Sequence, residues 1–341
     1  TIAPAAICQD TTIYLDASGN ASITPDMIDG GSTDNGTIAN ISASQLAFDC
    51  SNIGANSDTL FVTDQGGNTS FCVATVTVLD TIAPTVICQG VSVELDATGT
   101  AVITPIMLDN GSTDNCGTGT LTYSTSDSTF TDVGGFTVVL TVTDASGNSS
   151  TCTTTVTVND TIAPVAVCQP DTIYLDASGN ASIVATDING GSTDNDIIVS
   201  YTASQMAFDC SNIGGNTVTL VVTDAGGNTD SCQTTVTVLD TIAPTIVCQS
   251  ITIGLDSTGT AVIIATDIDG GTTDNCGTGT LTYTASDTSF AAVGSYTVTL
   301  TVTDASGNTS NCAATVLVAD GEPPVAICKP DTIYLNNAGN A

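Results

Sequence analysis

The sequence predicts an all-β chain of small sandwich domains, and three observations support this prediction. First, the segment Thr-Ile-Ala-Pro recurs at equal spacing, beginning at Thr1, Thr81, Thr161 and Thr241. A fixed period of this length indicates tandem copies of one small unit. Second, apolar and polar residues alternate with a period of two, as in half-buried strands. Third, Val and Thr fill these segments while Gly, Asn and Asp lie between them, which is typical of strands joined by turns.

The period divides the 341 residues into four complete repeats and the start of a fifth. We expect domains at residues 1–80 (type A), 81–160 (type B), 161–240 (type A) and 241–320 (type B), followed by a truncated repeat at 321–341. The chain starts at a repeat boundary and stops inside a repeat, so we expect a piece of a longer array. Each repeat follows the last without a Gly/Ser tether, and proline stiffens the connection. We therefore expect domains stacked end to end as a rod.

Within the first repeat, the alternation predicts strands at about 5–15, 20–25, 37–44, 45–50, 58–64 and 70–79. No segment has the 3.6-residue period of an amphipathic helix. Short strands separated by regular turns favour an antiparallel sandwich of the immunoglobulin type. A domain of this size has a thin core, so we expect cross-links to stabilise it.

The charge balance is extreme, because 35 acidic residues face one base, Lys329, and the chain has no Arg or His. Nucleic acid and anionic membrane surfaces are therefore excluded as partners, since both attract basic proteins. We expect no membrane insertion, because no apolar run is long enough. We also expect no enzyme activity, since His and Trp are absent and aromatic residues make up 4% of the chain. So many negative charges repel one another unless cations bind.

Four sequence motifs occur together in these repeats. They are D-x-x-x-P-x-x-x-C, STDNC, FDCSNIG and VTDxxGNxxxCxxxVxVxD, found for example at 80–88, 112–116, 208–214 and 142–160. Their combination resembles the HYR (hyalin) repeat and is similar to the long tandem versions in secreted surface proteins of Bacteroidetes. The resemblance covers all four repeats. It implies an immunoglobulin-like fold and a role in cell-surface adhesion, as in gliding-motility adhesins, but it supplies no ligand.

Cysteines occupy fixed positions in the repeats. The chain has 13, and every complete repeat has one at position 8 and one at position 72. Disulfides in an oxidising, extracellular setting explain this pattern better than zinc, because there is no C-x-x-C pair and no histidine. The first and last strands of an immunoglobulin-type domain are neighbours, so we expect the bonds Cys8–Cys72, Cys88–Cys152, Cys168–Cys232 and Cys248–Cys312. Each closes a loop of about 65 residues, worth roughly 4 kcal/mol in the chain-entropy model.

A third cysteine alternates between two positions, 50 in type A repeats and 36 in type B repeats. If position 50 bonds to position 36 of the following repeat, the pairs are Cys50–Cys116 and Cys210–Cys276, and both partners are absent between the second and third repeats. Two alternatives remain open: these cysteines are free buried thiols, or they cross-link separate chains. The cysteines thus double the period, and the true repeating unit is a pair of domains, one of type A and one of type B.

Four acidic motifs recur in the complete repeats: the LDASG or LDxTG turn, the STDN or TTDN loop, the TDxxGN loop and the boundary aspartate. In the expected topology, the STDN and TDxxGN loops share the N-terminal end of a domain. The LDASG turn and the boundary aspartate share the C-terminal end. All four motifs then converge where one repeat meets the next.

We expect calcium at the three junctions between complete repeats, because Ca²⁺ takes six to eight oxygen ligands of the kind that Asp, Asn and backbone carbonyls supply. The candidate ligands are Asp16, Asp80, Asp114, Asn115, Asp144 and Asn148 at the first junction, Asp96, Asp160, Asp194, Asn195, Asp224 and Asn228 at the second, and Asp176, Asp240, Asp274, Asn275, Asp304 and Asn308 at the third. The alternative interpretation is that these residues only form turns and cap strands.

These features predict a structural or adhesive segment of a long secreted cell-surface protein, a stalk or adhesin stiffened by calcium and disulfides. One alternative is a subunit of an extracellular filament or sheath, in which identical chains assemble laterally. Another makes the repeats themselves a ligand-binding surface. We expect neighbouring repeats to be the main partners, with glycans or another surface ligand bound by domains outside this segment. A filament requires an apolar or edge-strand stripe that recurs with every repeat or with every second repeat.

Overall fold

The computed structural model describes residues 2–117, 119, 121–278, 281–321, 323, 325–334, 337–338 and 340. The chain divides into two compact units. Unit 1 comprises Thr1–Pro164, Asp194–Val199 and Thr223–Thr229, and unit 2 comprises Val165–Thr193, Ser200–Val222 and Asp230–Ala341. Unit 1 therefore contains the first two repeats and two segments of the third, and unit 2 contains the remainder.

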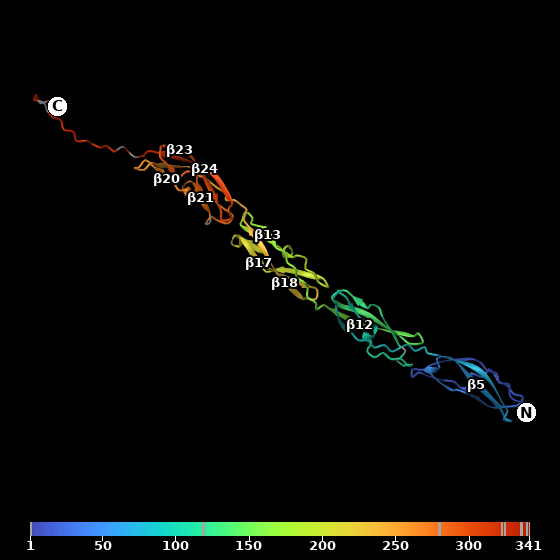
Figure 1. Ribbon diagram of the computed structural model, residues 1–341. Coiled ribbons are helices and arrows are strands. Elements are labelled where there is room, and N and C mark those ends of the chain that lie inside the picture. Colours follow the sequence, from blue (N-terminus) through green and yellow to red (C-terminus); the bar gives the residue numbers. More distant parts are fainter. Residues whose placement is uncertain are drawn as a thin grey trace. The chain divides into compact units, whose positions relative to one another are not determined.

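The first repeat folds into a larger and a smaller β-sheet around one core (Figure 1). Its strands are β1 (Thr11–Tyr14), β2 (Asn20–Ser22), β3 (Ile38–Ala43), β4 (Ala47–Asp49), β5 (Gly54–Asp64) and β6 (Thr69–Leu79), with the 3-10 helices η1 (Pro25–Met27) and η2 (Cys50–Asn52). The larger sheet has the order β1-β6-β5-β3, and β2 pairs with β4 in the smaller. β5 and β6 form a long antiparallel hairpin, and β1 runs parallel to β6.

The second repeat, also in unit 1, has the same plan. Its strands are β7 (Val91–Glu94), β8 (Ala101–Val102), β9 (Thr122–Thr125), β10 (Thr129–Phe130), β11 (Gly134–Thr143) and β12 (Ser149–Asn159), with the 3-10 helix η3 (Pro105–Leu108). The larger sheet has the order β7-β12-β11-β9, and β8 pairs with β10.

The third repeat supplies strands to unit 2, and the fourth repeat lies wholly within it. The third repeat has β13 (Asp171–Tyr174), β14 (Asn180–Ser182), η4 (Ala185–Ile188), β15 (Ile198–Ala203), β16 (Ala207–Asp209), η5 (Cys210–Asn212), β17 (Gly214–Asp224) and β18 (Thr229–Leu239). The fourth has β19 (Ile251–Gly254), β20 (Ala261–Val262), η6 (Ala265–Ile268), β21 (Thr282–Ala285), β22 (Ser289–Phe290), β23 (Gly294–Thr303) and β24 (Thr309–Ala319). β13 pairs with β18 and β14 with β16, while the fourth repeat has the order β19-β24-β23-β21 with β20-β22.

Alternation along the long strands builds each core. In β5 and β6, Leu60, Val62, Val76 and Val78 are fully buried, whereas the residues between them are more exposed. Val and Leu side chains at equivalent positions fill the cores of the second and fourth repeats. Burying one such side chain contributes about 1.5–3 kcal/mol, so a core this small gains much from covalent cross-links.

The prediction of an all-β immunoglobulin-like sandwich is confirmed, and the part of the chain that the structure describes contains no α-helix. The expected first strand at 5–15 is wrong in detail. Ala5 and Cys8 form isolated bridges to Thr33 and Asp29, and β1 starts only at Thr11, where the chain changes partner and joins β6. The parallel β1–β6 pair also departs from a wholly antiparallel arrangement. Strand β5 begins at Gly54, earlier than expected, because η2 compresses the preceding loop.

The two repeat types differ by a pair of compensating length changes. Phe48 of the first repeat and Phe130 of the second fill the same place, since each pairs with the equivalent alanine of the smaller sheet. They nevertheless stand at positions 48 and 50 of their repeats. The type B repeat is therefore longer before this phenylalanine and correspondingly shorter after it, where the type A repeat has η2 and its cysteine. The total length of the repeat is unchanged, so the period hides the exchange.

The described residues include no helix with the length and hydrophobicity that crossing a membrane requires. The described part of 321–341, the expected start of a fifth repeat, has no strand.

Candidate metal sites at the repeat junctions

Each junction brings the C-terminal end of one repeat against two loops of the next. The boundary aspartate and the LDASG-type turn come from the preceding repeat, and the STDN and TDxxGN loops come from the following one. The first and second junctions lie within unit 1, and the third lies within unit 2. The three can therefore be compared position by position.

An asparagine of the STDN loop joins the two repeats at every junction. At the first, the Asn115 side-chain amide donates to Asp80 Oδ1 at 3.2 Å and to the Asp16 carbonyl at 3.3 Å. Asn195 and Asn275 make the equivalent pair of bonds at the other junctions, at 3.1–3.3 Å. Both bonds are donated by the amide nitrogen, so the Oδ1 atom of each asparagine remains available as a hydrogen-bond acceptor or a metal ligand.

The TDxxGN loop forms a second link across the junction. Asp144 accepts the backbone N–H and the side-chain amide of Asn148, both at 2.8 Å. The same amide donates to the Asp80 carbonyl at 3.1 Å. The equivalent bonds to the boundary carbonyl are made by Asn228 at 3.0 Å and Asn308 at 3.1 Å. These aspartates lie at the junction and hold its loops together, and Asp144 is only 6% exposed.

Several side-chain oxygens at the junctions are buried without a hydrogen-bond partner. They are Asp114 Oδ1 and Asn115 Oδ1 at the first, Asp160 Oδ2, Asp194 Oδ1, Asn195 Oδ1 and Asp196 Oδ2 at the second, and Asp274 Oδ1 and Asn275 Oδ1 at the third. Turn formation uses the other oxygen: Asp114 Oδ2 accepts the N–H of Cys116 at 3.0 Å. The turn interpretation therefore explains one carboxylate oxygen and leaves the second without a role. A buried carboxylate oxygen without a partner is costly unless a cation compensates it.

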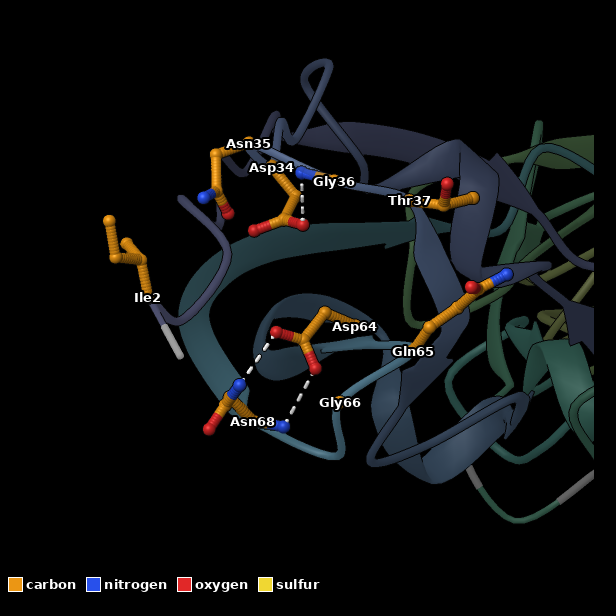
Figure 2. A pocket seen from close by; sticks show the side chains of 9 residues that line it. All are labelled: Ile2, Asp34, Asn35, Gly36, Thr37, Asp64, Gln65, Gly66 and Asn68. Carbon is orange, nitrogen blue, oxygen red and sulfur yellow. Dashed lines mark hydrogen bonds between the residues drawn. The ribbon is translucent and has the colours of Figure 1, made fainter.

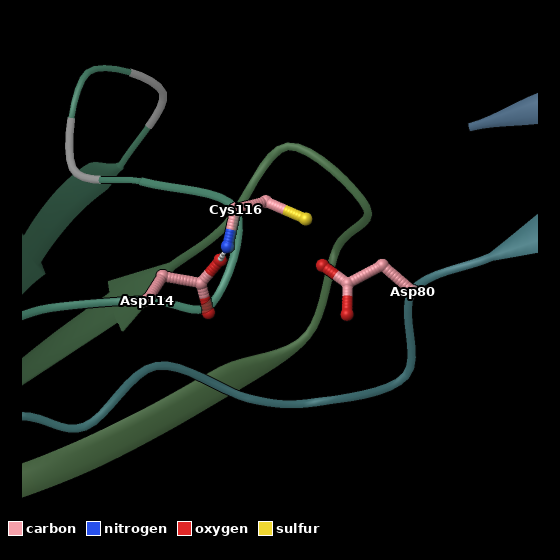
Figure 3. A group of neighbouring side chains, drawn as sticks. All are labelled: Asp80, Asp114 and Cys116. Atoms are coloured by element: carbon pink, nitrogen blue, oxygen red, sulfur yellow. Dashed lines mark hydrogen bonds between the residues drawn. The ribbon is translucent and has the colours of Figure 1, made fainter. Parts of the chain in front are cut away.

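Carboxylates from successive repeats also approach one another. Asp160, Asp194 and Asp224 each place one oxygen within 4.8 Å of the other two. At the first junction, the corresponding group is Asp80, Asp114 and the sulfur of Cys116, whose side chains face a common space in Figure 3. That sulfur is bonded to Cys50, so it is not a thiolate ligand. The third junction has the same arrangement, with Asp240, Asp274 and the disulfide-bonded Cys276.

The aspartates of the LDASG-type turns have a different role in the structure. Asp16 Oδ1 accepts the N–H groups of Ser18 and Asn20 within its own turn, and the side chain is exposed. Asp96, Asp176 and Asp256 have the same local bonds. The hydroxyl of Thr98 and then nearby N–H groups lower the pKa of Asp96. Only the carbonyl groups of Asp16, Asp96 and Asp176 reach across their junctions.

Two junctions carry a covalent bond, which we call the staple. The described residues form six disulfides, and each joins one of the pairs given above: four bonds within repeats and two staples, Cys50–Cys116 and Cys210–Cys276. In the staples, the Cα atoms are 5.4 and 5.5 Å apart. The second junction has no staple, because position 50 of its preceding repeat is the core residue Phe130. Cys328, in the fifth repeat, is a free exposed cysteine.

Glycines of the LDASG-type turns are junction residues that sequence reasoning did not identify. Gly19, Gly99 and Gly179 have φ between 73° and 74°. A Cβ atom on Gly19 or Gly179 would lie 2.6 Å from the carbonyl oxygen of Asn115 or Asn275, and one on Gly99 would clash with that of Asn195. These glycines therefore permit both the turn and the close approach of the next repeat. The signal in the sequence was the recurring final Gly of the turn motif.

The N-terminal end of the first repeat presents the same two loops. Asp34, Asp64 and Asn68 line an open cavity of about 350 Å³ (Figure 2). Asp34 Oδ1 is again buried without a partner. The Asn68 side-chain amide and then its N–H lower the pKa of Asp64. The unpartnered oxygen is thus a property of the STDN loop itself, since it occurs in all four repeats.

One junction carboxyl has a raised pKa. Burial, which is the largest cause, together with the neighbouring carboxylates Asp240 and Asp304, raises the pKa of Asp274 above its ordinary value of 3.8. The described residues contain one Lys and no Arg or His, and Lys329 lies in the fifth repeat. No basic side chain is therefore available at the junctions to neutralise these acids.

Comparison with known proteins identifies one of the repeats directly. Residues 239–318 match the family model described as "HYR domain". The chain is also 31% identical over 303 residues to hyalin of Strongylocentrotus purpuratus, an alignment covering 81% of this chain and 24% of hyalin. The chain thus spans about a quarter of the length of this relative.

Solved structures with some likeness include a protocadherin and a cadherin. A protocadherin gamma-B7 structure is 17% identical with a TM-score of 0.33, covering 93% of this chain and 100% of that one. Drosophila N-cadherin is 11% identical with a TM-score of 0.27, covering 92% and 99%. The similarity of residues 239–318 to HYR domains, the similarity to hyalin and the six disulfides together indicate an extracellular or cell-surface protein, because such bonds persist in oxidising surroundings.

Proposed function

We propose that this chain is a structural and adhesive segment of a longer cell-surface protein, in which calcium at the junctions orders successive repeats. It acts as a stalk that holds more distant binding domains away from the cell, and those domains carry the contacts with glycans or other surface ligands. The observation that carries the proposal is the recurrence, at three successive junctions, of buried aspartate and asparagine oxygens without partners beside carboxylates of the preceding repeat.

Calcium fits the donor set better than other common ions. All candidate donors are carboxylate, amide or carbonyl oxygens, which are hard ligands, and the sulfurs nearby are in disulfides. Calcium accepts flexible geometry and many oxygens, whereas magnesium prefers a tight octahedron with several waters. At the first junction Asp80, Asp114, Asn115 and Asp144 would hold the ion. When bound, it would supply positive charge to a chain that carries a net charge of −34.

The filament alternative keeps one supporting observation, because an exposed apolar side chain recurs at position 7 of every complete repeat: Ile7, Ile87, Val167 and Val247. Lateral assembly needs an apolar stripe that recurs with the repeat. The most obvious exposed aromatic pair, Phe61 and Phe71, has ring centroids 6.4 Å apart and lies on the β5–β6 hairpin of the first repeat. The equivalent positions in later repeats are Thr141 and Thr151, Val221 and Ser231, and Thr301 and Asn311. This pair therefore does not recur, and it supplies no periodic contact. An enzyme is also disfavoured, because the matched family is a repeat domain.

The test is calcium titration of the whole chain by isothermal titration calorimetry, with thermal unfolding in calcium and in EDTA. We expect binding at the junctions and a higher melting temperature in calcium, since a ligand at a hundred times its Kd stabilises by about 2.7 kcal/mol.

Asp80→Asn should remove or weaken one site, because the amide keeps the bond to Ile82 but loses the charge. Asp287→Asn is the matched control, since Asp287 is exposed and belongs to none of the four junction motifs. Equal melting temperatures in both buffers, with no heat of binding, would refute the proposal.

A further inference from the structure

The second junction has an aspartate where the stapled junctions have a cysteine. Asp196 follows Asn195 in the STDN loop, as Cys116 follows Asn115. Its N–H donates to Asp194 Oδ2 at 3.1 Å, and that of Cys116 donates to Asp114 Oδ2 at 3.0 Å. The two residues therefore start from the same point of the same turn. At the first junction this position places its sulfur within 4.8 Å of two carboxylates.

The burial of the second junction points to a ligand. Asp160 is 5% exposed and its Oδ2 has no hydrogen-bond partner, while its Oδ1 accepts from Ile162 and Asn195. Asp196 Oδ2 is also buried without a partner. Asp224, only 1% exposed, completes the group within 4.8 Å that includes Asp160 and Asp194. Three carboxylates are thus gathered in a region with no basic side chain, and Asp196 is close to Asp194 in the same loop.

The group of three does not include Asp196, which occupies the position that Cys116 has at the first junction. Its Cγ atom lies one bond beyond Cβ, like the Cys116 sulfur that approaches Asp80 and Asp114 at the first junction. Its carboxylate oxygens extend one bond further. Ionised carboxylates gathered this closely repel one another, and a cation from solution offsets the repulsion.

We propose that Asp196 is an additional carboxylate ligand of a divalent cation at the second junction, together with Asp160, Asp194 and Asp224. The ion there does what the staple does at the first and third junctions. The chain consequently alternates two kinds of joint, one held by a covalent bond and one held by a cation. This inference rests on the proposed function, because it assumes that calcium binds at the junctions. It adds that the junction without a staple depends on calcium most.

The experiment follows each junction separately in the whole chain by hydrogen exchange and mass spectrometry, with CaCl₂ or EDTA as the only variable. We expect EDTA to accelerate exchange in 157–166 by about tenfold or more, and to change the equivalent segments 77–86 and 237–246 less, because staples keep their loops in place. Asp196→Asn should weaken calcium binding at this site by about tenfold, because calcium affinity depends on the number of charged ligands. Asp287→Asn is the control for loss of one charge.

The outcomes separate this inference from the proposed function. If calcium leaves exchange and heat of binding unchanged at all three junctions, the proposed function fails. If calcium binds but EDTA affects the three junctions equally, or Asp196→Asn binds like the wild type, only the present inference is overturned. Retained exchange protection of the β17 and β18 core in Asp196→Asn would show that the variant is folded.

Discussion

The first and second junctions use the same loops but different chemistry. Both have the bridging asparagine, the TDxxGN loop and the glycine turn, and their hydrogen bonds agree within a few tenths of an ångström. The first adds the Cys50–Cys116 bond, and the second adds Asp196. The hydrogen bonds therefore do not distinguish the first junction from the second. We therefore expect the residue at position 36 to decide whether a junction stays ordered in the absence of a cation.

Removing the staple should have the largest effect on this comparison. Cys50→Ser with Cys116→Ser opens a link between residues 66 apart in sequence, which the chain-entropy model values at about 4 kcal/mol. We expect hydrogen exchange at 77–86 to become sensitive to EDTA, as we expect for 157–166. The third junction keeps its staple and serves as the internal control. If 77–86 stays protected in EDTA, the staple is not what distinguishes the two junctions.

A glycine substitution tests how closely the repeats must approach. Gly99→Ala strains a residue at φ 74° and places a Cβ against the Asn195 carbonyl. Gly259→Ala strains the equivalent turn, at φ 79°, where a Cβ meets nothing within 4 Å. Both variants should lose about 1 kcal/mol from backbone strain. Gly99→Ala should lose about 1–3 kcal/mol more from overpacking, measured as faster exchange at the second junction. Equal losses in the two variants would argue against a tight junction.

The smallest expected effect is a pH dependence that differs between two sites. In EDTA, the contribution of Asp274 to stability is fully present at a pH below 3.8, its pKa in the unfolded chain. Because the pKa is raised in the folded chain, this contribution is lost as the pH rises through the folded pKa. The lowered pKa of Asp64 works in the opposite direction, with stability present above 3.8 and lost as pH falls. The protection factor near Asp274, which corrects exchange for its intrinsic pH dependence, should therefore fall from acid toward neutral pH, and Asp274→Asn should abolish this trend. Calcium should reverse it, because the ion binds the ionised carboxylate.

Local sequence patterns were sufficient for most of the fold. The alternation in 70–79 predicted β6 almost to the residue, because a half-buried strand leaves a period-two record. The change of pairing partner between Cys8 and Thr11 left no pattern in the sequence. The chain is extended on both sides of it, and only the neighbouring strand differs. The length exchange around Phe130 was also invisible, because it leaves the repeat length unchanged.

The candidate sites were predictable to a similar degree. Recurring Asp and Asn motifs led to Asp80, Asn115 and Asn148, which the structure brings to one junction. The motifs could not reveal that Asp16 uses its carboxylate within its own turn, because a turn residue and a ligand have the same sequence signature. Asp196 was overlooked since it lies outside the shared motif. Its signal was the variation at position 36 from Gly to Cys to Asp.

The staple limits which deletions and duplications of repeats keep every cysteine paired. A recombination event that deleted the second repeat would place the Cys50 end beside the Asp196 loop, and it would leave Cys50 without its partner. Loss or gain of an adjacent pair of repeats would keep every bond. Unequal exchange between gene copies can therefore lengthen or shorten the array safely only by whole A–B pairs. The A–B pair is therefore the unit of duplication. A product that lost or gained a single repeat would carry an unpaired, reactive thiol in the oxidising exterior.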